Sequence, residues 1–173
     1  PNAVTILGLM VAGLAGAVLS FGYLWVGGVV MLGGACLDLV DGSLARRKGL
    51  ATNFGALLDS VLDRLQEAII LLGLLIYFLQ DSNNIGTILA YTTFVSSVMV
   101  SYLRARSEGL GIECKIGLMT RPERVVILAG GIIVSTWIEG GLYICMVVIS
   151  ALGLITVAQR LIHSFRMFRR KSG

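Results

Sequence analysis

The 173-residue sequence has few charged side chains, and this shortage indicates its class. Only 14% of the residues are Asp, Glu, Lys or Arg, whereas 56% are hydrophobic, and the mean hydropathy is +0.87. A soluble globular domain carries about 25% charged residues. The composition therefore excludes an ordinary soluble domain and indicates a membrane protein.

Cysteine and histidine are also sparse. The three cysteines, Cys36, Cys114 and Cys145, lie in different segments and have no CxxC spacing. Neither a disulfide nor a thiolate metal site is therefore predicted, and we interpret the cysteines as small apolar side chains. His163 is the single histidine and lies close to the C-terminal end, where we predict no catalytic role for it.

Internal repeats, low-complexity tracts and the composition shift of a second domain are missing as well. We therefore predict one domain over residues 1–173. No signal-peptide pattern precedes the first apolar segment. The sequence begins at Pro1 without a Met, so an upstream piece is expected to be missing from it.

What the chain does contain is a series of long apolar segments. A helix that crosses a bilayer needs about 20 predominantly apolar residues. Six segments can be placed, with approximate limits 3–22, 25–45, 54–79, 85–105, 122–138 and 141–163. The sequence therefore predicts an all-α, polytopic membrane protein with six transmembrane helices.

Basic residues are absent from alternate connections between these segments. The connections around 20–25, 80–85 and 138–142 contain only Asp81 and Glu139 as charged residues. All 14 basic residues lie near the second-to-third loop, the fourth-to-fifth loop or the C-terminus. The positive-inside rule assigns such loops to the cytoplasm, so we expect both termini there. Because the basic residues flank apolar spans, we do not predict nucleic-acid binding.

Four aspartates interrupt the apolar pattern of the second and third segments. They are Asp38, Asp41, Asp59 and Asp63. Residues three or four apart share a helix face, so each pair presents two carboxylates side by side. A short basic loop between the segments would allow the two pairs to face each other. An aspartate near the centre of a membrane helix costs about 2.5–3.5 kcal/mol, which makes such residues functional candidates.

Four carboxylates that converge would repel one another unless cations lay between them. Oxygen ligands of this kind suit Mg²⁺, Mn²⁺ or Ca²⁺ rather than zinc. The alternative is that the aspartates are solvated helix ends at the membrane interface. Solvation alone does not explain the paired spacing, so we predict a metal site.

The same stretch carries a longer pattern, Asp-x2-Asp-Gly-x2-Ala-Arg-x8-Gly-x3-Asp-x3-Asp. Its fixed positions are Asp38, Asp41, Gly42, Ala45, Arg46, Gly55, Asp59 and Asp63, with every spacing kept. On these residues the sequence resembles the CDP-alcohol phosphotransferases, integral-membrane enzymes of phospholipid headgroup synthesis. The resemblance implies transfer of a phosphatidyl group from a CDP-linked lipid to a polar alcohol, with release of CMP.

The resemblance also implies roles for individual residues. The four aspartates would hold two cations, Mg²⁺ or Mn²⁺, which neutralise the diphosphate and the departing CMP. Asp63 would be the general base for the acceptor hydroxyl, with Arg64 and Glu67 as supporting neighbours. The CDP-lipid would be bound by Pro1, Asn2, Thr5, Gly42, Arg46 and Thr52. Residues 1–5 also fit an ordinary helix start, and Arg46 could instead anchor its helix at the interface.

A second, shorter pattern follows the fourth segment. It reads Ser101-Tyr102-x-Arg104-Ala105-Arg106 and later Arg121-Pro122-Glu123-Arg124. This is similar to the inositol-phosphate-using branch of the family, which is bacterial and archaeal. The similarity implies an acceptor-phosphate site formed by Ser101, Arg104, Arg121, Arg124 and Arg160. The arginines could instead be the cytoplasmic charge of their loop.

We therefore expect a cell-membrane enzyme whose active site faces the cytoplasm. Its donor would be CDP-diacylglycerol or an archaeal CDP-lipid, and its acceptor inositol phosphate. Glycerol 3-phosphate, giving phosphatidylglycerol phosphate, is the main alternative acceptor, and a headgroup product built from CDP-inositol is another. A cation or proton transporter should distribute its ionisable groups across the membrane, whereas here they gather on one side. The family resemblance also implies a homodimer.

Overall fold

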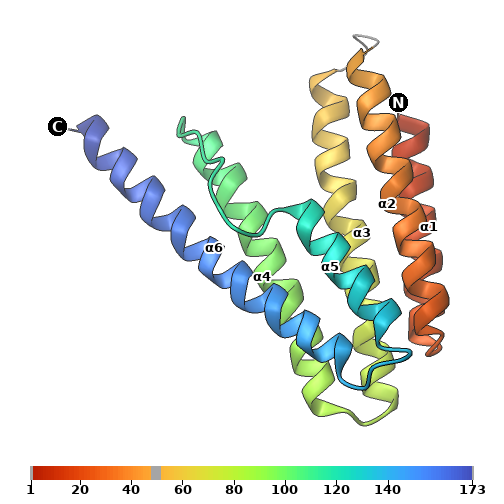
Figure 1. Cartoon of the computed structure of the whole chain (residues 1–173). Helices are drawn as coiled ribbons and strands as arrows, with labels where there is room; N and C mark the ends of the chain where they lie inside the picture. Colours follow the sequence, from red (N-terminus) through yellow and green to blue (C-terminus); the bar gives the residue numbers. More distant parts are fainter. Residues whose placement is uncertain (1, 48–51, 173) are drawn as a thin grey trace.

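The described part of the chain folds into helices alone. The computed structural model describes residues 2–47 and 52–172, and side chains within 6–36 and 52–170. The helices are α1 (Asn2–Ser20), α2 (Leu24–Arg47), α3 (Asn53–Gln80), α4 (Asn84–Gly109), α5 (Arg121–Val134) and α6 (Gly141–Ser172) (Figure 1). No strand occurs within these ranges, which confirms the all-α prediction.

The helices differ in how clearly they could cross a membrane. By length and composition, Asn84–Gly109 of α4 and Gly141–Arg170 of α6 are the membrane-spanning candidates among the described residues. The apolar parts of α1 and α2, Ile6–Ser20 and Leu24–Cys36, are shorter. Helix α5 has 14 residues, or about 21 Å, which is less than the roughly 30 Å of a bilayer core.

Helix α5 is shorter than the apolar pattern predicts. The sequence predicts a segment over 122–138, but the helix ends at Val134. Tight turns follow, in which Trp137 and Ile138 both donate their backbone N–H to Val134 O. Gly140 then adopts a positive φ of 83°, a conformation that glycine tolerates without steric cost. The apolar residues after Val134 therefore belong to a turn rather than to the helix.

Capping residues fix the starts of α3 and α5, the two helices that carry the charged side chains of the candidate site. Thr52 caps α3, because its side-chain oxygen accepts a hydrogen bond from the backbone N–H of Gly55 at 3.0 Å. Thr120 caps α5 in a capping box with Glu123, whose Oε2 accepts from the backbone N–H of Thr120 at 2.9 Å. Pro122 lies in the first turn of α5, where its missing N–H costs no hydrogen bond.

Helix α1 is the centre of the N-terminal half, because it packs against both α2 and α3. Its crossing with α3 is close: a Cβ on Gly73 would lie 2.3 Å from the carbonyl oxygen of Gly16. Only glycine fits at that contact, and the buried core beside it includes Leu19, Leu71 and Leu74. The other closely packed pairs are α3 with α4, α2 with α5, α5 with α6, and α4 with α6.

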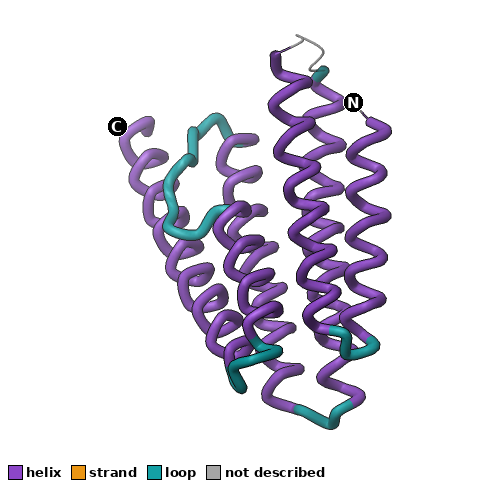
Figure 2. The backbone as a smooth tube through the Cα atoms, turned by 45° about the vertical axis from the view of Figure 1, so that its right-hand side comes forward, coloured by secondary structure: helices purple, strands orange, loops and turns teal. Residues whose placement is uncertain are grey.

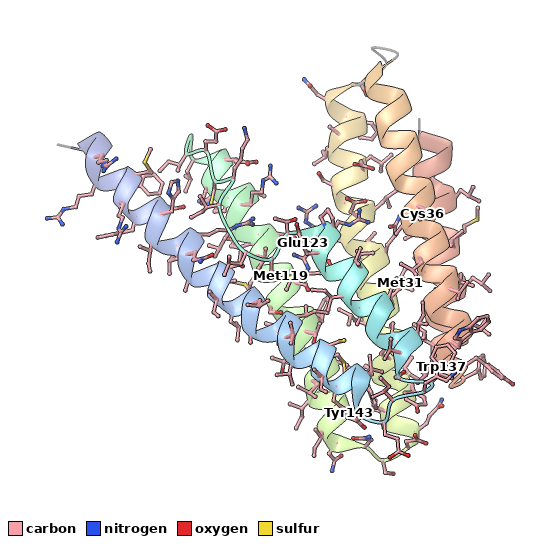
Figure 3. The ribbon with its side chains drawn as sticks, in the orientation of Figure 1. Met31, Cys36, Met119, Glu123, Trp137 and Tyr143 are labelled. Carbon is pink, nitrogen blue, oxygen red and sulfur yellow. The ribbon has the colours of Figure 1, made fainter. Side chains whose placement is uncertain are left out.

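The connections separate into two ends of the molecule. The start of α1, the end of α2, the start of α3 and the end of α6 lie toward one end (Figure 1). The α1–α2, α3–α4 and α5–α6 connections lie at the opposite end (Figure 2), together with Trp137 and Tyr143 (Figure 3). The ends of the described helices are thus arranged as an alternating up-and-down chain would have them, which the charge pattern also predicts. Which end faces the cytoplasm stays a prediction.

Candidate active site

One face of α3 carries a row of polar side chains that lines a pocket. Asp59, Asp63, Gln66 and Glu67 are followed by Ile70, a spacing that keeps all five on the same side of the helix. The pocket has a volume of about 210 Å³. The other lining residues are Gly8, Val11 and Ala12 from α1, Met31, Gly34 and Ala35 from α2, and Arg121, Pro122, Val125, Val126 and Leu128 from α5.

The positively charged side chain of Arg121, at the start of α5, contacts Asp63 of α3. The guanidinium of Arg121 lies in the first turn, with its Nη2 2.9 Å from Oδ1 of Asp63. The same nitrogen donates a hydrogen bond to Oε1 of Gln66 at 2.9 Å. Both contacts are charge-assisted and therefore stronger than a neutral hydrogen bond. They hold Asp63 and Gln66 in fixed positions at the pocket wall.

A second arginine of α5 pairs with the same face of α3. Arg124 donates from Nε to Oε1 of Glu67 at 2.8 Å and from Nη2 to Oε2 at 3.0 Å. The two side chains are only 2% and 9% exposed, so this two-pronged ion pair is buried. Removing one partner of such a pair leaves the other charge uncompensated. The pair therefore fixes the distance between α3 and α5 beside the pocket.

The residues predicted to bind the acceptor phosphate do not all meet at this pocket. Arg121 lines it, and Arg124 pairs with Glu67, which lines it. Arg160 of α6 is 3% exposed and donates to the backbone oxygens of Ile116, at 2.9 Å, and Val100.

The remaining acceptor-site predictions lie on α4, outside the lining of the pocket. Arg104 is exposed and forms an ion pair with Glu108, its Nε 2.9 Å from Oε1. Ser101 precedes it on the same helix and is partly exposed. Arg104 is therefore reachable from solvent, unlike Arg124 and Arg160.

Several predicted residues lie outside the described part of the structure. Pro1 is one of them, and the side chains of Asn2, Thr5, Asp38, Asp41, Gly42 and Arg46 are not described although these positions belong to α1 and α2. Thr52 is described and caps α3. The roles that the sequence predicts for these residues therefore stay predictions.

The described carboxylates fit part of a metal site. Asp59 and Asp63 both line the pocket and offer oxygen ligands of the kind that Mg²⁺ and Mn²⁺ prefer. Among the described side chains, no three His, Cys, Asp or Glu groups gather closely enough to hold a metal. A complete site would need further ligands, and the two aspartates of α2 are the ones that the sequence pattern offers.

Gln66 is the pocket residue that the sequence reasoning missed. It lies three positions after Asp63 and so shares its helix face. That spacing was a usable signal, whereas its partner Arg121 is 55 residues away and could not be inferred from local spacing. Arg64 donates to the backbone oxygen of Ser60 on its own helix, and its supporting role stays a prediction.

The sequence is similar to known lipid synthases over almost its full length. The family model of CDP-alcohol phosphatidyltransferase matches residues 1–162. An archaetidylinositol phosphate synthase of Methanothermobacter thermautotrophicus is 36% identical over 170 residues, covering 96% of this chain and 83% of the relative. A phosphatidylinositol phosphate synthase of Mycobacteroides abscessus is 34% identical over 170 residues, covering 96% and 77%.

Solved structures agree with the sequence comparison. The crystal structure of Mycobacterium tuberculosis phosphatidylinositol phosphate synthase with CDP-DAG bound has a TM-score of 0.87 and 30% identity, covering 95% of this chain and 86% of that one. The same synthase in complex with manganese and citrate has a TM-score of 0.89 and 30% identity, covering 95% and 82%. Together with the aspartates on the pocket wall, these matches show that the chain belongs to the CDP-alcohol phosphatidyltransferase family and is a transferase of phospholipid biosynthesis.

Proposed function

We propose that this protein transfers the phosphatidyl group of CDP-diacylglycerol, or of an archaeal CDP-lipid, to inositol phosphate. The observation that carries the proposal is the contact between Asp63 and Arg121, whose Oδ1 and Nη2 are 2.9 Å apart. It joins the aspartate pattern of the family to the arginine pattern of the inositol-phosphate branch at one pocket. The names of the relatives, archaetidylinositol and phosphatidylinositol phosphate synthases, support this acceptor.

The same proposal includes a divalent metal site, with two Mg²⁺ or Mn²⁺ ions held by Asp38, Asp41, Asp59 and Asp63. Gly34 and Ala35 of α2 line the pocket opposite the aspartates of α3. Positions 38 and 41 follow them at helical spacing, so they continue the same side of α2. The manganese complex of the similar synthase supports a divalent cation. Bound cations would supply charge neutralisation for the diphosphate and the departing CMP.

Asp63 is the proposed general base. The hydroxyl oxygen of the acceptor attacks the phosphorus of the lipid phosphate, the bond from that phosphorus to CMP breaks, and Asp63 takes the hydroxyl proton. Arg121 holds the carboxylate in place for this transfer. We also propose that Pro1, Asn2, Thr5, Gly42, Arg46 and Thr52 bind the CDP-lipid. The hydroxyl of Thr52 accepts from Gly55 N–H and keeps its own proton for a donated hydrogen bond.

We propose Ser101, Arg104, Arg121, Arg124 and Arg160 for the acceptor phosphate, and their different contacts support different tasks within this proposal. Arg104 has an exposed partner, Glu108, and such surface ion pairs are weak enough for a phosphate to replace them. Arg124 and Arg160 are buried and already bound to protein oxygens. They would therefore act mainly by fixing α5 and the 110–120 connection around the acceptor.

The membrane arrangement is part of the proposal. We propose six spanning helices, a homodimer, and a cytoplasmic face that carries both termini and the active site. In a cysteine-free background, Lys115→Cys should react with an impermeant thiol reagent from the cytoplasmic side, whereas Asn84→Cys should not. Both positions are exposed. The reverse pattern would overturn the orientation.

The function is tested by measuring CMP release from CDP-diacylglycerol with each acceptor in turn. We expect release with inositol phosphate and a divalent cation, and little release with glycerol 3-phosphate. A chelator should abolish the reaction. Turnover of glycerol 3-phosphate without turnover of inositol phosphate would contradict the acceptor assignment and leave the reaction class in place.

A further inference from the structure

The side-chain amide of Gln66 places a hydrogen-bond donor, its Nε2 group, in the pocket, and the proposed reaction assigns this group no role. The Gln66 side chain is only 6% exposed, and it lines the pocket one helical turn after Asp63. Its Oε1 accepts from Arg121. A guanidinium can only donate, so this contact fixes which end of the amide is which. The Nε2 group is therefore turned away from Arg121.

The amide nitrogen of Gln66 has no hydrogen-bond partner within the described structure, and it is buried. Buried donors without partners are rare in native proteins, because each loses its hydration without compensation. The neighbouring polar groups on this face are occupied: Asp63 by Arg121 and Glu67 by Arg124. A bound molecule that offers an oxygen atom would satisfy the amide.

The surroundings of Gln66 indicate which oxygen this is. Gln66 lies about 4.5 Å further along the helix axis than Asp63. Beyond it α3 contributes Glu67, whose charge is paired with Arg124, and then Ile70, and the apolar lining of the pocket includes Val11 and Met31. A polyol placed there would bury several hydroxyls without partners, at a cost for each of them. An ester carbonyl, in contrast, needs only one hydrogen-bond donor, and the acyl chain attached to it is apolar like this lining.

We propose that Gln66 determines the specificity for the lipid donor, because its Nε2–H group donates a hydrogen bond to an ester carbonyl oxygen of the CDP-lipid. In the lipid, the ester carbonyls lie a few bonds from the diphosphate, toward the acyl chains. In the protein, Gln66 lies on the apolar side of Asp63. A lipid with its diphosphate at Asp63 and its acyl chains along the apolar lining would therefore place an ester carbonyl near Gln66. The inference rests on the proposed function. It predicts that the enzyme distinguishes ester-linked from ether-linked lipid donors.

The test compares CDP-diacylglycerol with the CDP derivative of a 1,2-dialkylglycerol of the same chain lengths. In the unmodified enzyme, KM for the ether lipid should exceed KM for the ester lipid by about threefold to tenfold, the worth of one hydrogen bond. The two kcat values should be similar, since the contact is made equally in the bound lipid and in the transition state.

Two variants and a control assign this preference to the amide. Gln66→Met keeps the length of the side chain without its polar atoms, and Gln66→Glu keeps an acceptor oxygen for Arg121 without the N–H group. Both should bring the ratio of the two KM values close to one. Because each ratio compares two lipids on one variant, a general loss of folded enzyme cancels. Gln159→Met removes another amide with a buried, unpartnered atom, on α6 and outside the pocket, and should keep the ratio.

Each other outcome contradicts a defined statement. Equal KM values in the unmodified enzyme, or a ratio that persists in both Gln66 variants, would overturn the role of Gln66 while the proposed function stands. A raised KM for inositol phosphate with an unchanged lipid ratio would assign the amide to the acceptor and overturn the inference. Absence of CMP release from both lipids with every acceptor would overturn the proposed function, and this inference with it.

Discussion

The pocket between α3 and α5 and the contact between α4 and α6 both bury polar side chains, but of different kinds. At the pocket the partners are charged, as in Glu67 with Arg124. Between α4 and α6 neutral hydroxyls pair with each other, as Thr93 and Ser150 do with their oxygens 3.0 Å apart. The one buried cation there among the described residues, Arg160, is bound by backbone oxygens rather than by a carboxylate. Inside a membrane, such neutral contacts contribute about 0.6 kcal/mol on average, whereas breaking a buried ion pair costs about 3–5 kcal/mol.

Buried polar side chains therefore serve two purposes in this apolar molecule: some join helices, and others lie at the candidate site. The hydroxyls form hydrogen bonds with each other and with the backbone. They therefore join the helices without adding a net charge that would attract a charged ligand. Charged side chains of opposite sign, Asp63 with Arg121 and Glu67 with Arg124, pair where a pocket opens between α1, α2, α3 and α5. The proposed reaction, whose substrates are anionic, would use charged groups at this pocket. Substitutions in the two regions should therefore have different consequences.

The largest effect is expected at the aspartates. Asp63→Asn should lower kcat for CMP release by about 10²–10⁴-fold, because the proposed general base is lost. Asp38→Asn, Asp41→Asn and Asp59→Asn should lower it as strongly through loss of the proposed metal ligands. Activity is measured at saturating Mg²⁺ or Mn²⁺, and the elution profile in detergent checks folding. An unaffected rate in any one of the four variants would break the two-metal description.

The next largest effect concerns the buried pair. Arg124→Ala should destabilise the protein by about 3–5 kcal/mol, because Glu67 is left charged and buried. The double variant Arg124→Met with Glu67→Leu should recover most of this loss. Thermal unfolding in detergent measures both. A single variant of normal stability with only a raised KM for inositol phosphate would show that Arg124 binds substrate rather than Glu67.

Arg104 should affect the acceptor without affecting the fold. Loss of one charge-assisted hydrogen bond of about 1.5–3 kcal/mol should raise KM for inositol phosphate about ten- to a hundredfold in Arg104→Ala. KM for CDP-diacylglycerol should change little. Arg106→Ala is the matched control, since Arg106 is exposed on the same helix. Equal effects of the two substitutions would mean that both arginines act only through their surface charge and that Arg104 does not bind the acceptor phosphate specifically.

The smallest effect is expected in the α4–α6 contact. Thr93→Val keeps the shape of the side chain and removes its hydrogen bonds to Ser150 and to the backbone oxygen of Leu89. Stability should fall by about 0.6 kcal/mol and by no more than about 1.7 kcal/mol, with kcat unchanged. A large loss of activity with normal unfolding would contradict the division between the two regions.

Much of the fold could be predicted because apolar length and helical period are local properties. The six segments match the six helices of the described residues, but two ends differ from the prediction. The fifth apolar run continues past Val134 into a turn closed by Gly140, and α6 extends to Ser172 instead of ending near residue 163. The face of α3 with Asp59 and Asp63 also followed from spacing alone. Both features depend on residues close together in the sequence.

The partners of the arginines could not be predicted in the same way. Glu67 and Arg124 are 57 residues apart, and their pairing depends on how α5 packs beside α3. The family similarity implies that Arg160 belongs to the acceptor site, and that role stays a proposal. The structure adds that its guanidinium holds the backbone oxygens of Ile116 and Val100. Such contacts arise from tertiary packing, on which local spacing has no bearing.

The central claim is that lipid donor and inositol phosphate react at the pocket of Asp63 and Arg121. The most direct measurement is the mass and amount of the lipid product formed by purified protein from CDP-diacylglycerol, inositol phosphate and Mg²⁺. We predict phosphatidylinositol phosphate in a one-to-one ratio with CMP, and neither product after Asp63→Asn. CMP formed without that lipid, or the same lipid formed at an unchanged rate by Asp63→Asn, would contradict the claim.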